Sequence, residues 1–412
     1  FYGDIDGDGI VDVIIGAQGG DPPGGSAAGE TYVISMFKDK ETSFTLTVNP
    51  TNTAPVLTSV VLSSTNNNNN LSGSNLTISV FGSDADGDSI KNITDWRIWN
   101  ASQAVSIAVL NIPFENNTIN VSNSTKDYSS FGNNGTVINA TYNTTGGYDG
   151  KGAYEFDDIE DYIEMNHSVS LNLTSSLSVE AWVKTSGVTS TTNRWNTVVG
   201  KGDDGESADV NHNYLLGYSS TTFGGTGLMF VIENSSGANC NATSTIVPTL
   251  GVWYHLVGVF DDNAGKVYLY INGNQTVNVA CTLSVNTNSR PVRIGRDEHS
   301  QGFAWNGTID EVRIYNRSLS TSQIKTLYQN KTDLIVFNET NSGEVWQACV
   351  TPNDGTVDGN QVCSNNLTVF PNRAPNITSL SIGSSYITNF TGDNLSASIS
   401  VTDLDGDNIY NV

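Results

Sequence analysis

The stretch FAWNGTIDEVRIYNRSLSTSQIKTLY, residues 303–328, passes from a strand-like segment into STSQIKTLYQN, residues 320–330. The latter is the one segment of the chain with a helical pattern. Elsewhere, short runs of alternating apolar and polar residues are broken by Gly, Asn and Asp, which is typical of strands joined by turns. The sequence therefore predicts an all-β protein with one short helix.

Five further motifs precede this stretch. They are DYSSFGNNGTV (127–137), GYDGKGAYEFDDIEDYIEM (147–165), LSVEAWVKT (177–185), GVWYHLVGVFDDNAGKVYLYINGN (251–274) and RPVRIGR (290–296). Together with residues 303–328, the series resembles the LamG-type jelly roll of the concanavalin A-like lectin and glucanase superfamily. The resemblance covers residues 119–330 and implies two antiparallel sheets packed face to face, with loops gathered along one rim.

The residues on either side of this region repeat one another. APVLTSVVLSS and LTISVFGSDADGDSI, between residues 54 and 90, return as APNITSLSIGS and LSASISVTDLDGDNI between residues 374 and 409. GETYV and SFTLTVNPTNTAP, between 29 and 55, parallel GEVWQACV and NNLTVFPNRAP, between 343 and 375. These repeats resemble the PKD and cadherin-like Ig modules of prokaryotic, including archaeal, cell-surface proteins.

The spacing of the repeats predicts that one sandwich module is interrupted. The two linkers are about 320 residues apart, whereas one such module needs roughly 100 residues. We expect the jelly roll to be inserted into an Ig-like β-sandwich, since an insertion needs only termini that lie close together. The expected parts are 1–52 (end of a preceding β module), 53–118 (first part of the sandwich), 119–330 (jelly roll), 331–371 (closing strands of the sandwich) and 372–412 (start of the next module).

Residues 154–165, YEFDDIEDYIEM, contain the carboxylate spacing of laminarinase-type glycoside hydrolases. In that family, Glu155, Asp157 and Glu160 would be nucleophile, helper and acid/base. The LamG pattern instead makes GAYEF and DYIEM consecutive strands of a hairpin, with DDIE as the turn. Glu160 then lies in or after the turn, whereas glycoside hydrolysis needs its carboxylates facing one cleft. We therefore predict no catalytic residues and no enzyme activity.

The histidines and aromatic residues also favour structural roles. His255 lies in the alternating strand WYHLVGVF, so a structural histidine is favoured over a general base. Trp182, Trp253, Tyr268 and Tyr270 are interpreted as core or sheet-face residues rather than as a sugar-binding platform.

Calcium is the predicted cofactor, and its strongest signal is DIDGDGIVD at residues 4–12. The oxygen ligands would come from four carboxylates and one carbonyl, namely Asp4, Asp6, Asp8, Asp12 and the carbonyl of Ile10. The glycines would let the loop curl around a hard cation. The segment lacks the Glu of the twelfth EF-hand position and resembles the FG-GAP loop of integrin-type propellers. A plain Asp/Gly turn is the alternative.

Other acidic segments give weaker calcium signals. SDADGDS and TDLDGDN place carboxylates at expected module junctions, where cadherin-like modules bind calcium; these are Asp84, Asp86, Asp88, Asp403, Asp405 and Asp407. The LamG resemblance implies a structural calcium at Asp310, with Asp127 as a further ligand. Hydrogen-bonded turns or exposed salt bridges are the alternative in each case. The acidic loop 202–213 is either a ligand contact or a solvated loop.

The net charge argues against a nucleic-acid partner, and the hydropathy argues against a membrane span. The chain has 42 Asp and Glu against 18 Lys and Arg, a net charge of −24, which argues against nucleic acid because a phosphate backbone attracts cations. It fits a surface that binds divalent cations, or one that simply resists aggregation. The chain contains no run of about twenty apolar residues, so the sequence predicts no membrane-spanning helix. Because the chain begins and ends within motifs, we expect a segment of a longer protein, with any anchor elsewhere.

Cysteines and sequons both indicate an extracellular protein. Cys349 and Cys363 flank a predicted hairpin, and Cys240 and Cys281 bracket another strand-rich stretch. Such pairing indicates two disulfides, with reduced buried thiols as the alternative. Asn-x-Ser/Thr sequons recur along the chain and predict a glycosylated surface. The candidates are Asn70, Asn75, Asn92, Asn100, Asn134, Asn166, Asn234, Asn274, Asn306, Asn338 and Asn376.

Three functions fit these features. The leading hypothesis is a non-enzymatic, calcium-stabilised adhesion or surface protein, in which Ig-like spacers display the jelly roll to a glycan or protein ligand. The second is a structural subunit of a filament or surface layer, in which partial modules of neighbouring copies complete one another end to end. The third is the carbohydrate-binding part of a larger glycoside hydrolase.

Overall fold

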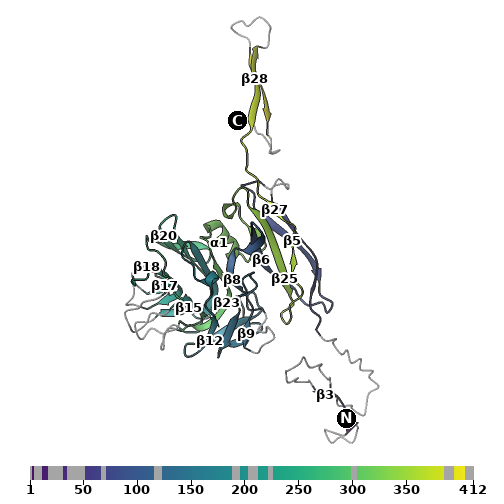
Figure 1. The fold of residues 1–412 in the computed structure, drawn as a ribbon. Coiled ribbons are helices and arrows are strands. Elements are labelled where there is room, and N and C mark those ends of the chain that lie inside the picture. Colours follow the sequence, from purple (N-terminus) through teal and green to yellow (C-terminus); the bar gives the residue numbers. More distant parts are fainter. Residues whose placement is uncertain are drawn as a thin grey trace. The chain divides into compact units, whose positions relative to one another are not determined.

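The computed structural model describes residues 2–3, 12–16, 31–34, 52–65, 71–115, 123–187, 195–202, 212–220, 226–297, 304–384 and 394–403 (Figure 1). The chain divides into two compact units, Phe1–Thr51 and Asn52–Val412. The first unit contains a small antiparallel sheet of β1 (Tyr2–Gly3), β2 (Asp12–Gly16) and β3 (Thr31–Ile34). All other elements belong to the second unit.

The largest body of the second unit, here called the jelly roll, contains two antiparallel sheets. The β14 sheet has the order β11 (Thr141–Asn143), β12 (Ala153–Asp157), β23 (Asn306–Tyr315), β14 (Leu177–Thr185), β19 (Trp253–Asp261), β20 (Lys266–Ile271) and β21 (Asn274–Ala280), with β8 (Ala108–Ile112) also paired to β23. The β16 sheet has the order β18 (Asn239–Thr243), β17 (Gly227–Glu233), β16 (Tyr214–Ser219), β15 (Trp195–Lys201), β22 (Val292–Ile294), β13 (Tyr162–Met165), β10 (Gly135–Ile138) and β9 (Ser124–Thr125). The two face-to-face sheets expected from the sequence are therefore present.

The core of the jelly roll forms where the inner faces of the two sheets meet. Alternate residues of β17, such as Phe230, point into this core, whereas Met229 and Val231 join a separate apolar cluster with Trp195. Both faces of this strand are buried, which explains its continuous apolar sequence. Gly258 allows the sheets to approach closely, because a Cβ there would lie 2.1 Å from the Phe230 ring.

One α-helix, α1 (Thr321–Tyr328), covers part of the outer face of the β14 sheet (Figure 1). Its first turn is capped by the Ser320 hydroxyl, which accepts a hydrogen bond from the Gln323 N–H. Ile324 and Leu327 pack against apolar residues of β19, β20 and β23. The predicted helix at 320–330 is confirmed. Two short 3-10 helices, η1 (Val169–Leu171) and η2 (Phe337–Glu339), complete the helical content of the described residues. None of these helices is long and apolar enough to cross a bilayer.

A second body is built from strands on both sides of the jelly roll in the sequence. It is here called the Ig-like body, after the resemblance of its sequence described above. One sheet contains β4 (Val56–Ser64), β5 (Leu76–Ser83) and β24 (Leu334–Ile335). The other contains β6 (Lys91–Asn100), β7 (Gln103–Ser106), β25 (Val345–Asn353), β26 (Val362–Cys363) and β27 (Leu367–Thr368). β5 pairs with β24 and β6 with β25, and one core cluster contains residues of both segments, including Trp96 and Trp346 in edge contact at 6.3 Å.

Two local expectations differ from the structure. Residues 108–112 were expected at the end of the Ig-like segment, but β8 pairs with β23, and Leu110 and Ile112 are fully buried in the jelly-roll core. GAYEF and DYIEM were expected to form a hairpin. β12 instead pairs with β11 and β23, while β13 pairs with β10 and β22 in the opposite sheet. The turn between them therefore crosses from one sheet to the other.

The last described element is the antiparallel hairpin of β28 (Asn376–Ser384) and β29 (Leu395–Thr402). Its pairing matches that of β4 and β5, including a register shift two residues into the first strand. The sequence repeat at 54–90 and 374–409 is thus matched by a repeated hairpin.

Candidate functional site

The three carboxylates with hydrolase spacing do not lie on one strand. Glu155 and Asp157 are exposed on the same face of β12, and Glu160 is exposed in the following turn. The Glu155 carboxylate accepts a hydrogen bond from Asn143 Nδ2 at 2.7 Å. The Asp157 carboxylate accepts the Ile159 N–H at 2.9 Å, and so shapes the turn. The hairpin proposed from the sequence is wrong, but Glu160 does lie outside the strand, as expected.

His255 belongs to a buried polar network on the outer face of the β14 sheet. Its Nε2 lies 3.0 Å from Glu180 Oε1. Arg313 Nη1 lies 3.4 Å from the same oxygen, and the Tyr315 hydroxyl donates to Glu180 Oε2 at 3.0 Å. Burial raises the pKa of Tyr315 well above its ordinary value, and the adjacent Glu180 charge adds to the effect. Glu180 is thus held by three partners, and the buried contact of His255 with it is the arrangement expected of a structural histidine.

Aromatic side chains form a stack beside this network. The rings of Tyr148 and Trp182 stack at 3.3 Å, and Tyr328 of α1 stacks on the same indole at 5.7 Å. Trp253 is half-buried at the edge of the stack, with the Lys184 ammonium 4.8 Å from its ring centroid. Trp182 and Tyr270 are buried and Tyr268 is half-buried, so the four aromatic residues lie in the core or on a sheet face; this placement does not by itself decide against sugar binding.

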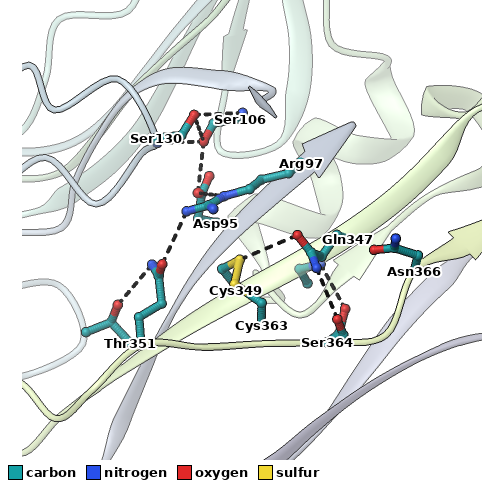
Figure 2. Close-up of a disulfide and its surroundings, with 12 residues drawn as sticks. Asp95, Arg97, Ser106, Ser130, Gln347, Cys349, Thr351, Cys363, Ser364 and Asn366 are labelled. Atoms are coloured by element: carbon teal, nitrogen blue, oxygen red, sulfur yellow. Dashed lines mark hydrogen bonds and ion pairs between the residues drawn. A yellow bond between two sulfur atoms is a disulfide. The ribbon is translucent and has the colours of Figure 1, made fainter. Parts of the chain in front are cut away.

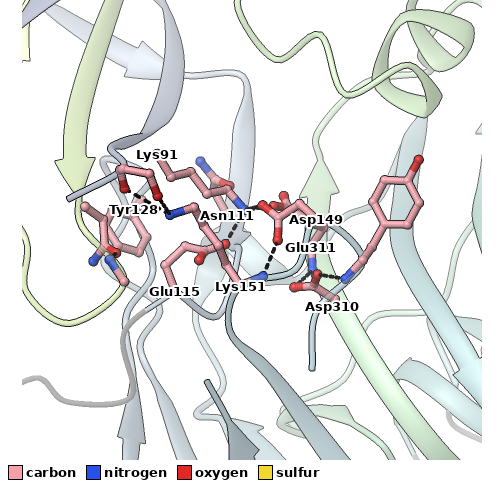
Figure 3. Close-up of polar contacts among 12 residues, drawn as sticks. Lys91, Asn111, Glu115, Tyr128, Asp149, Lys151, Asp310 and Glu311 are labelled. Atoms are coloured by element: carbon pink, nitrogen blue, oxygen red, sulfur yellow. Dashed lines mark hydrogen bonds and ion pairs between the residues drawn. The ribbon is translucent and has the colours of Figure 1, made fainter. Parts of the chain in front are cut away.

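A cluster of charges lies where β6 meets the jelly roll (Figure 3). Carboxylate oxygens of Glu115, Asp149 and Glu311 lie within 4.8 Å of one another. The Lys91 ammonium, at the start of β6, contacts Asp149 Oδ2 at 2.7 Å and also contacts Glu115 and Glu311. The other Glu311 oxygen contacts Arg313, which links the cluster to the Glu180 network.

The surroundings shift the ionisation of these groups in opposite directions. Burial raises the pKa of Glu115 to about 7, although the Lys91 charge opposes the rise. Burial would also raise the pKa of Glu311, but the charges of Lys91 and Arg313 outweigh it and lower that pKa to about 2. Burial opposes the charge of Lys91, yet the carboxylates raise its pKa above the ordinary value. The ammonium therefore supplies the positive charge that these carboxylates need.

Sequence reasoning missed this cluster. Asp149 and Glu311 lie inside motifs that the sequence analysis quoted, but Lys91 and Glu115 lie outside them. Glu311 reaches the cluster with a positive φ of 52°, beside a register shift in the pairing of β14 with β23. Four segments far apart in the sequence therefore meet at one point, which no local pattern indicates.

The two calcium candidates of the jelly roll are engaged by hydrogen bonds. Asp310 is fully buried and accepts the N–H groups of Tyr148 at 2.9 Å and Glu311 at 2.8 Å. Burial raises the pKa of Asp310 well above its ordinary value, with the Glu311 charge adding to it. Asp127 accepts four hydrogen bonds, from the N–H groups of residues 111, 129 and 133 and from the Ser129 hydroxyl. Calcium at Asp127 and Asp310 stays a prediction.

Among the remaining calcium candidates, Asp84 has the most distinctive environment. Its Oδ1 accepts the N–H groups of Asp86 at 2.8 Å and Asp88 at 3.2 Å, whereas its Oδ2 is buried and has no hydrogen-bond partner in the described part of the chain. The Asp86 carboxylate accepts the Thr53 N–H at 2.6 Å. Asp403 is half-buried. The candidates that lie outside the described residues, or whose side chains do, are Asp4, Asp6, Asp8, Ile10, Asp12, Asp405 and Asp407, together with most of the acidic loop 202–213.

A second buried ionic group lies in the jelly roll and was also missed. His212 Nδ1 lies 3.5 Å from Glu233 Oε2, and its Nε2 lies 3.8 Å from Asp297 Oδ2. Burial lowers the pKa of His212, but its contacts with Asp297 and Glu233 outweigh burial and raise the pKa to about 9. His212 is therefore a cation held between two carboxylates.

Both predicted disulfides are present. Cys349 and Cys363 are directly opposed across β25 and β26, as the hairpin pattern indicated (Figure 2). Cys240 of β18 is bonded to Cys281, which follows β21. These strands end the β16 sheet and the β14 sheet respectively, so this disulfide joins the two sheets at one edge.

The predicted glycosylation sites lie at or near the surface. Asn70 lies outside the described residues, and the other candidates are exposed or half-buried. Asn92, Asn100, Asn166 and Asn376 are among the exposed ones. Their glycosylation stays a prediction.

Comparison with known proteins identifies the jelly roll. Residues 156–325 match the family model of the concanavalin A-like lectin/glucanases superfamily, Laminin_G_3. These residues thus form a concanavalin A-like jelly-roll domain. A search of curated proteins finds no significant match.

Several solved structures resemble part of the chain. Domain 4 of AbnA, a GH43 extracellular arabinanase from Geobacillus stearothermophilus, in complex with arabinotriose, is 20% identical, with a TM-score of 0.41, over 57% of this chain and 100% of that one. The binding domain of Paraclostridial Mosquitocidal Protein 1 is 16% identical, with a TM-score of 0.43, over 54% and 52%. The ligand-binding domain of botulinum neurotoxin serotype D, in complex with N-acetylneuraminic acid, is 15% identical, with a TM-score of 0.42, over 55% and 51%. The chain spans about half the length of these two toxin domains.

Proposed function

We propose that this chain is part of a non-enzymatic extracellular surface protein, in which Ig-like modules carry the jelly roll as a recognition head for glycan or protein ligands. The observation that carries the proposal is the match of residues 156–325 to the concanavalin A-like lectin/glucanases family. The family name covers both binding and hydrolysis, so the arrangement of carboxylates is the second argument.

Two buried carboxylates of the jelly roll have structural partners that disfavour a role in hydrolysis. Glu180 is held by His255, Arg313 and Tyr315, and Glu311 by Lys91 and Arg313. A glycosidase needs one carboxyl free to give a proton and a second free to attack or to activate water. Paired, buried carboxylates are poorly suited to either task.

An extracellular location is supported by the covalent chemistry of the chain. Two disulfides are of the kind that forms and persists in oxidising compartments. Sequons such as Asn92 and Asn166 are exposed, so an oligosaccharide there would meet solvent.

The modular arrangement is supported by the strand pairing. β6 pairs with β25 and β5 with β24, although the whole jelly roll separates these partners in the sequence. An inserted domain produces this pattern, because the strands before and after it still complete one sandwich. The jelly roll would thus be displayed from one module of a series.

Calcium is proposed at the Asp84 loop. Asp84 Oδ2 is buried and has no hydrogen-bond partner among the residues that the structure describes. Such a carboxylate oxygen is costly to bury unless a cation neutralises it. Asp86 and Asp88 lie beside it on the same loop and could supply further oxygens. A calcium-dependent rise in melting temperature that EGTA reverses and Asp84→Asn abolishes is expected. An EGTA-insensitive wild-type melt would refute calcium stabilisation.

Recognition by the head is tested with the full chain on an array of glycans, with calcium or with EGTA. In parallel, the chain is incubated with intact cells that have been treated with protease or with glycosidases. Binding to defined glycans, or protease-sensitive binding to cells, is expected. Hydrolysis of a β-glucan that Glu155→Gln abolishes would overturn the non-enzymatic assignment.

A structural role in a filament or surface layer is the second candidate; in it, strands of a second copy would cover the apolar face of the β28–β29 hairpin. Ile377, Leu380 and Ile382 are 60%, 62% and 72% exposed. The matching β4 residues Leu57 and Leu62 are 8% and 3% exposed, because the closing strands of the Ig-like body cover them. Concentration-dependent polymers in electron micrographs, lost in Leu380→Lys, are expected if a second copy covers this face. Dispersed monomers at high concentration would contradict assembly.

A further inference from the structure

A groove on the outer face of the β14 sheet lies between β20, β21 and the beginning of α1. Its volume is about 210 Å³, whereas one water molecule needs roughly 10–15 Å³. Two apolar residues of its lining, Val259 and Leu319, are buried. The rest of the lining is aromatic or polar and consists of Asp261, Tyr268, Tyr270, Gln275, Ser320 and Thr321. The groove therefore combines two aromatic rings with a largely polar lining.

The aromatic side of the groove is fixed by hydrogen bonds. Tyr268 and Tyr270 lie side by side on β20, with ring centroids 6.3 Å apart. The Tyr270 hydroxyl is 3.0 Å from Thr321 Oγ1 and donates to Gln275 Oε1 at 3.4 Å. Tyr270 thus connects β20 to α1 and orients Gln275. The Tyr268 ring remains half-exposed, and its hydroxyl makes no hydrogen bond to the described residues.

The polar groups of the groove keep free hydrogen-bonding capacity. Asp261 Oδ1 accepts the Ala264 N–H at 3.0 Å, which leaves Oδ2 without a partner among the described residues. Gln275 uses its carbonyl oxygen on Tyr270, which leaves its amide N–H₂ available to donate. An acceptor and a donor therefore stand beside a half-exposed aromatic ring.

We propose that this groove binds one neutral pyranose ring of a glycan. A pyranose has an apolar C–H face that packs on an aromatic ring, and hydroxyl groups that both donate and accept. The C–H face lies on Tyr268, Asp261 Oδ2 accepts one or two hydroxyl groups, and the Gln275 amide donates to a neighbouring sugar oxygen. The proposal rests on the recognition function proposed above and gives that function a site and a ligand class. It departs from the interpretation of the sequence, which gave Tyr268 no part in sugar binding, because the groove beside this half-exposed ring forms only in the folded chain.

The charge of the groove selects against acidic sugars. Of the lining residues that the structure describes, only Asp261 is charged, and the whole chain carries −24. A sialic acid or uronic acid would bring a second carboxylate next to Asp261, at a cost in like-charge repulsion. Neutral glycans are therefore preferred.

The experiment uses the full chain on an array that carries neutral, sialylated and uronate-containing glycans. The best neutral oligosaccharide is then titrated in solution by NMR, with an expected Kd on the order of 1 mM for a single shallow subsite. Tyr268→Ala is expected to weaken binding about tenfold through loss of the stacking ring. Asp261→Asn weakens it less, and Tyr268→Phe retains most of it. Tyr162→Ala removes a half-buried aromatic residue of the opposite sheet and is the matched control. Thermal melts confirm that each variant is folded.

Neutral-glycan binding that is lost in Tyr268→Ala, reduced in Asp261→Asn and kept in Tyr162→Ala supports the groove. Binding of neutral glycans that both groove variants retain would overturn the groove but leave the recognition function intact. A preference for sialylated or uronate-containing glycans would also overturn it. Absence of any glycan binding refutes the groove, and the recognition function itself fails only if the cell-binding arm is negative as well.

Discussion

Replacing Lys91 with methionine removes the positive charge from the junction between the Ig-like body and the jelly roll. Glu115 and Glu311 would then be left buried beside Asp149, with Arg313 as the nearest remaining cation of the cluster. Breaking a buried ion group by removing one partner costs about 3–5 kcal/mol, because the remaining charges lose their compensation. At about 2–4 °C per kcal/mol for a domain of this size, the jelly-roll transition should fall by roughly 6–20 °C in calorimetry at pH 7.5.

The pH dependence of this loss gives a second readout. The folded-state pKa of Glu115 is raised to about 7 from its ordinary 4.5, so its contribution to stability increases as pH falls through 7 and is lost as pH rises through it. Protonation at low pH also removes one of the charges that Lys91→Met leaves uncompensated. The difference in melting temperature between variant and wild type is therefore expected to be smaller at pH 5.5 than at pH 8.

Lys151→Met is the matched control for Lys91→Met. Lys151 lies close to the same cluster (Figure 3), but among the described residues its ammonium bonds only to Ser89, at 3.1 Å and 3.3 Å, in an exposed setting. Its replacement should change stability by no more than about 0.5 kcal/mol. The reasoning is refuted if Lys91→Met melts like Lys151→Met, or if its loss of stability is the same at pH 5.5 and pH 8.

Three further perturbations test separate parts of the jelly roll. The pKa of His212 is raised from 6.5 to about 9, so the stability it confers is fully present below pH 6.5 and is lost as pH rises through 9. Urea titrations at several pH values should show this fall in the free energy of unfolding for the wild type but not for His212→Gln. The same fall in both proteins would contradict the role of His212. Gly258→Ala places a Cβ 2.1 Å from the Phe230 ring of β17 and should lower the free energy of unfolding by about 1–3 kcal/mol. Gly383→Ala is the control: its added Cβ would have no atom within 4 Å, so the melting temperature of the jelly roll should not change. Replacing Cys240 and Cys281 by serine opens a loop of 41 residues and should lower the free energy of unfolding, measured by urea titration, by about 4 kcal/mol. Replacing Cys349 and Cys363, which are 14 residues apart, should lower it by about 3 kcal/mol. The reverse order would show that native contacts outweigh loop entropy.

The sequence was informative wherever a property depends on neighbouring residues. The helix at 320–330 follows from its local pattern, and α1 occupies Thr321–Tyr328. The opposition of Cys349 and Cys363 follows from a hairpin, in which distance along the chain fixes distance in space. The place of His255 on one face of its strand follows from the alternating pattern, whose inner and outer positions are set by the two-residue period.

Local patterns were insufficient where strands pair over long distances. YEFDDIEDYIEM has the pattern of a hairpin, yet β12 and β13 join opposite sheets, because their partners β23 and β10 lie elsewhere in the chain. β8 looked like a continuation of the Ig-like strands, but its apolar residues are buried in the jelly-roll core. Alternation defines which side chains are buried without defining the sheet against which they are buried.

The sequence alone determined the all-β class, the jelly roll, the short helix and the cysteine pairing, because these depend on composition, period and motif order. Only the tertiary structure decided which charges meet. It placed Lys91 among carboxylates from three other segments, His212 between Glu233 and Asp297, and Tyr268 beside Asp261 in an open groove. Such contacts arise from the packing of sheets whose strands are distant in the sequence, and a group's pKa and ligand-binding capacity depend on its neighbours in space.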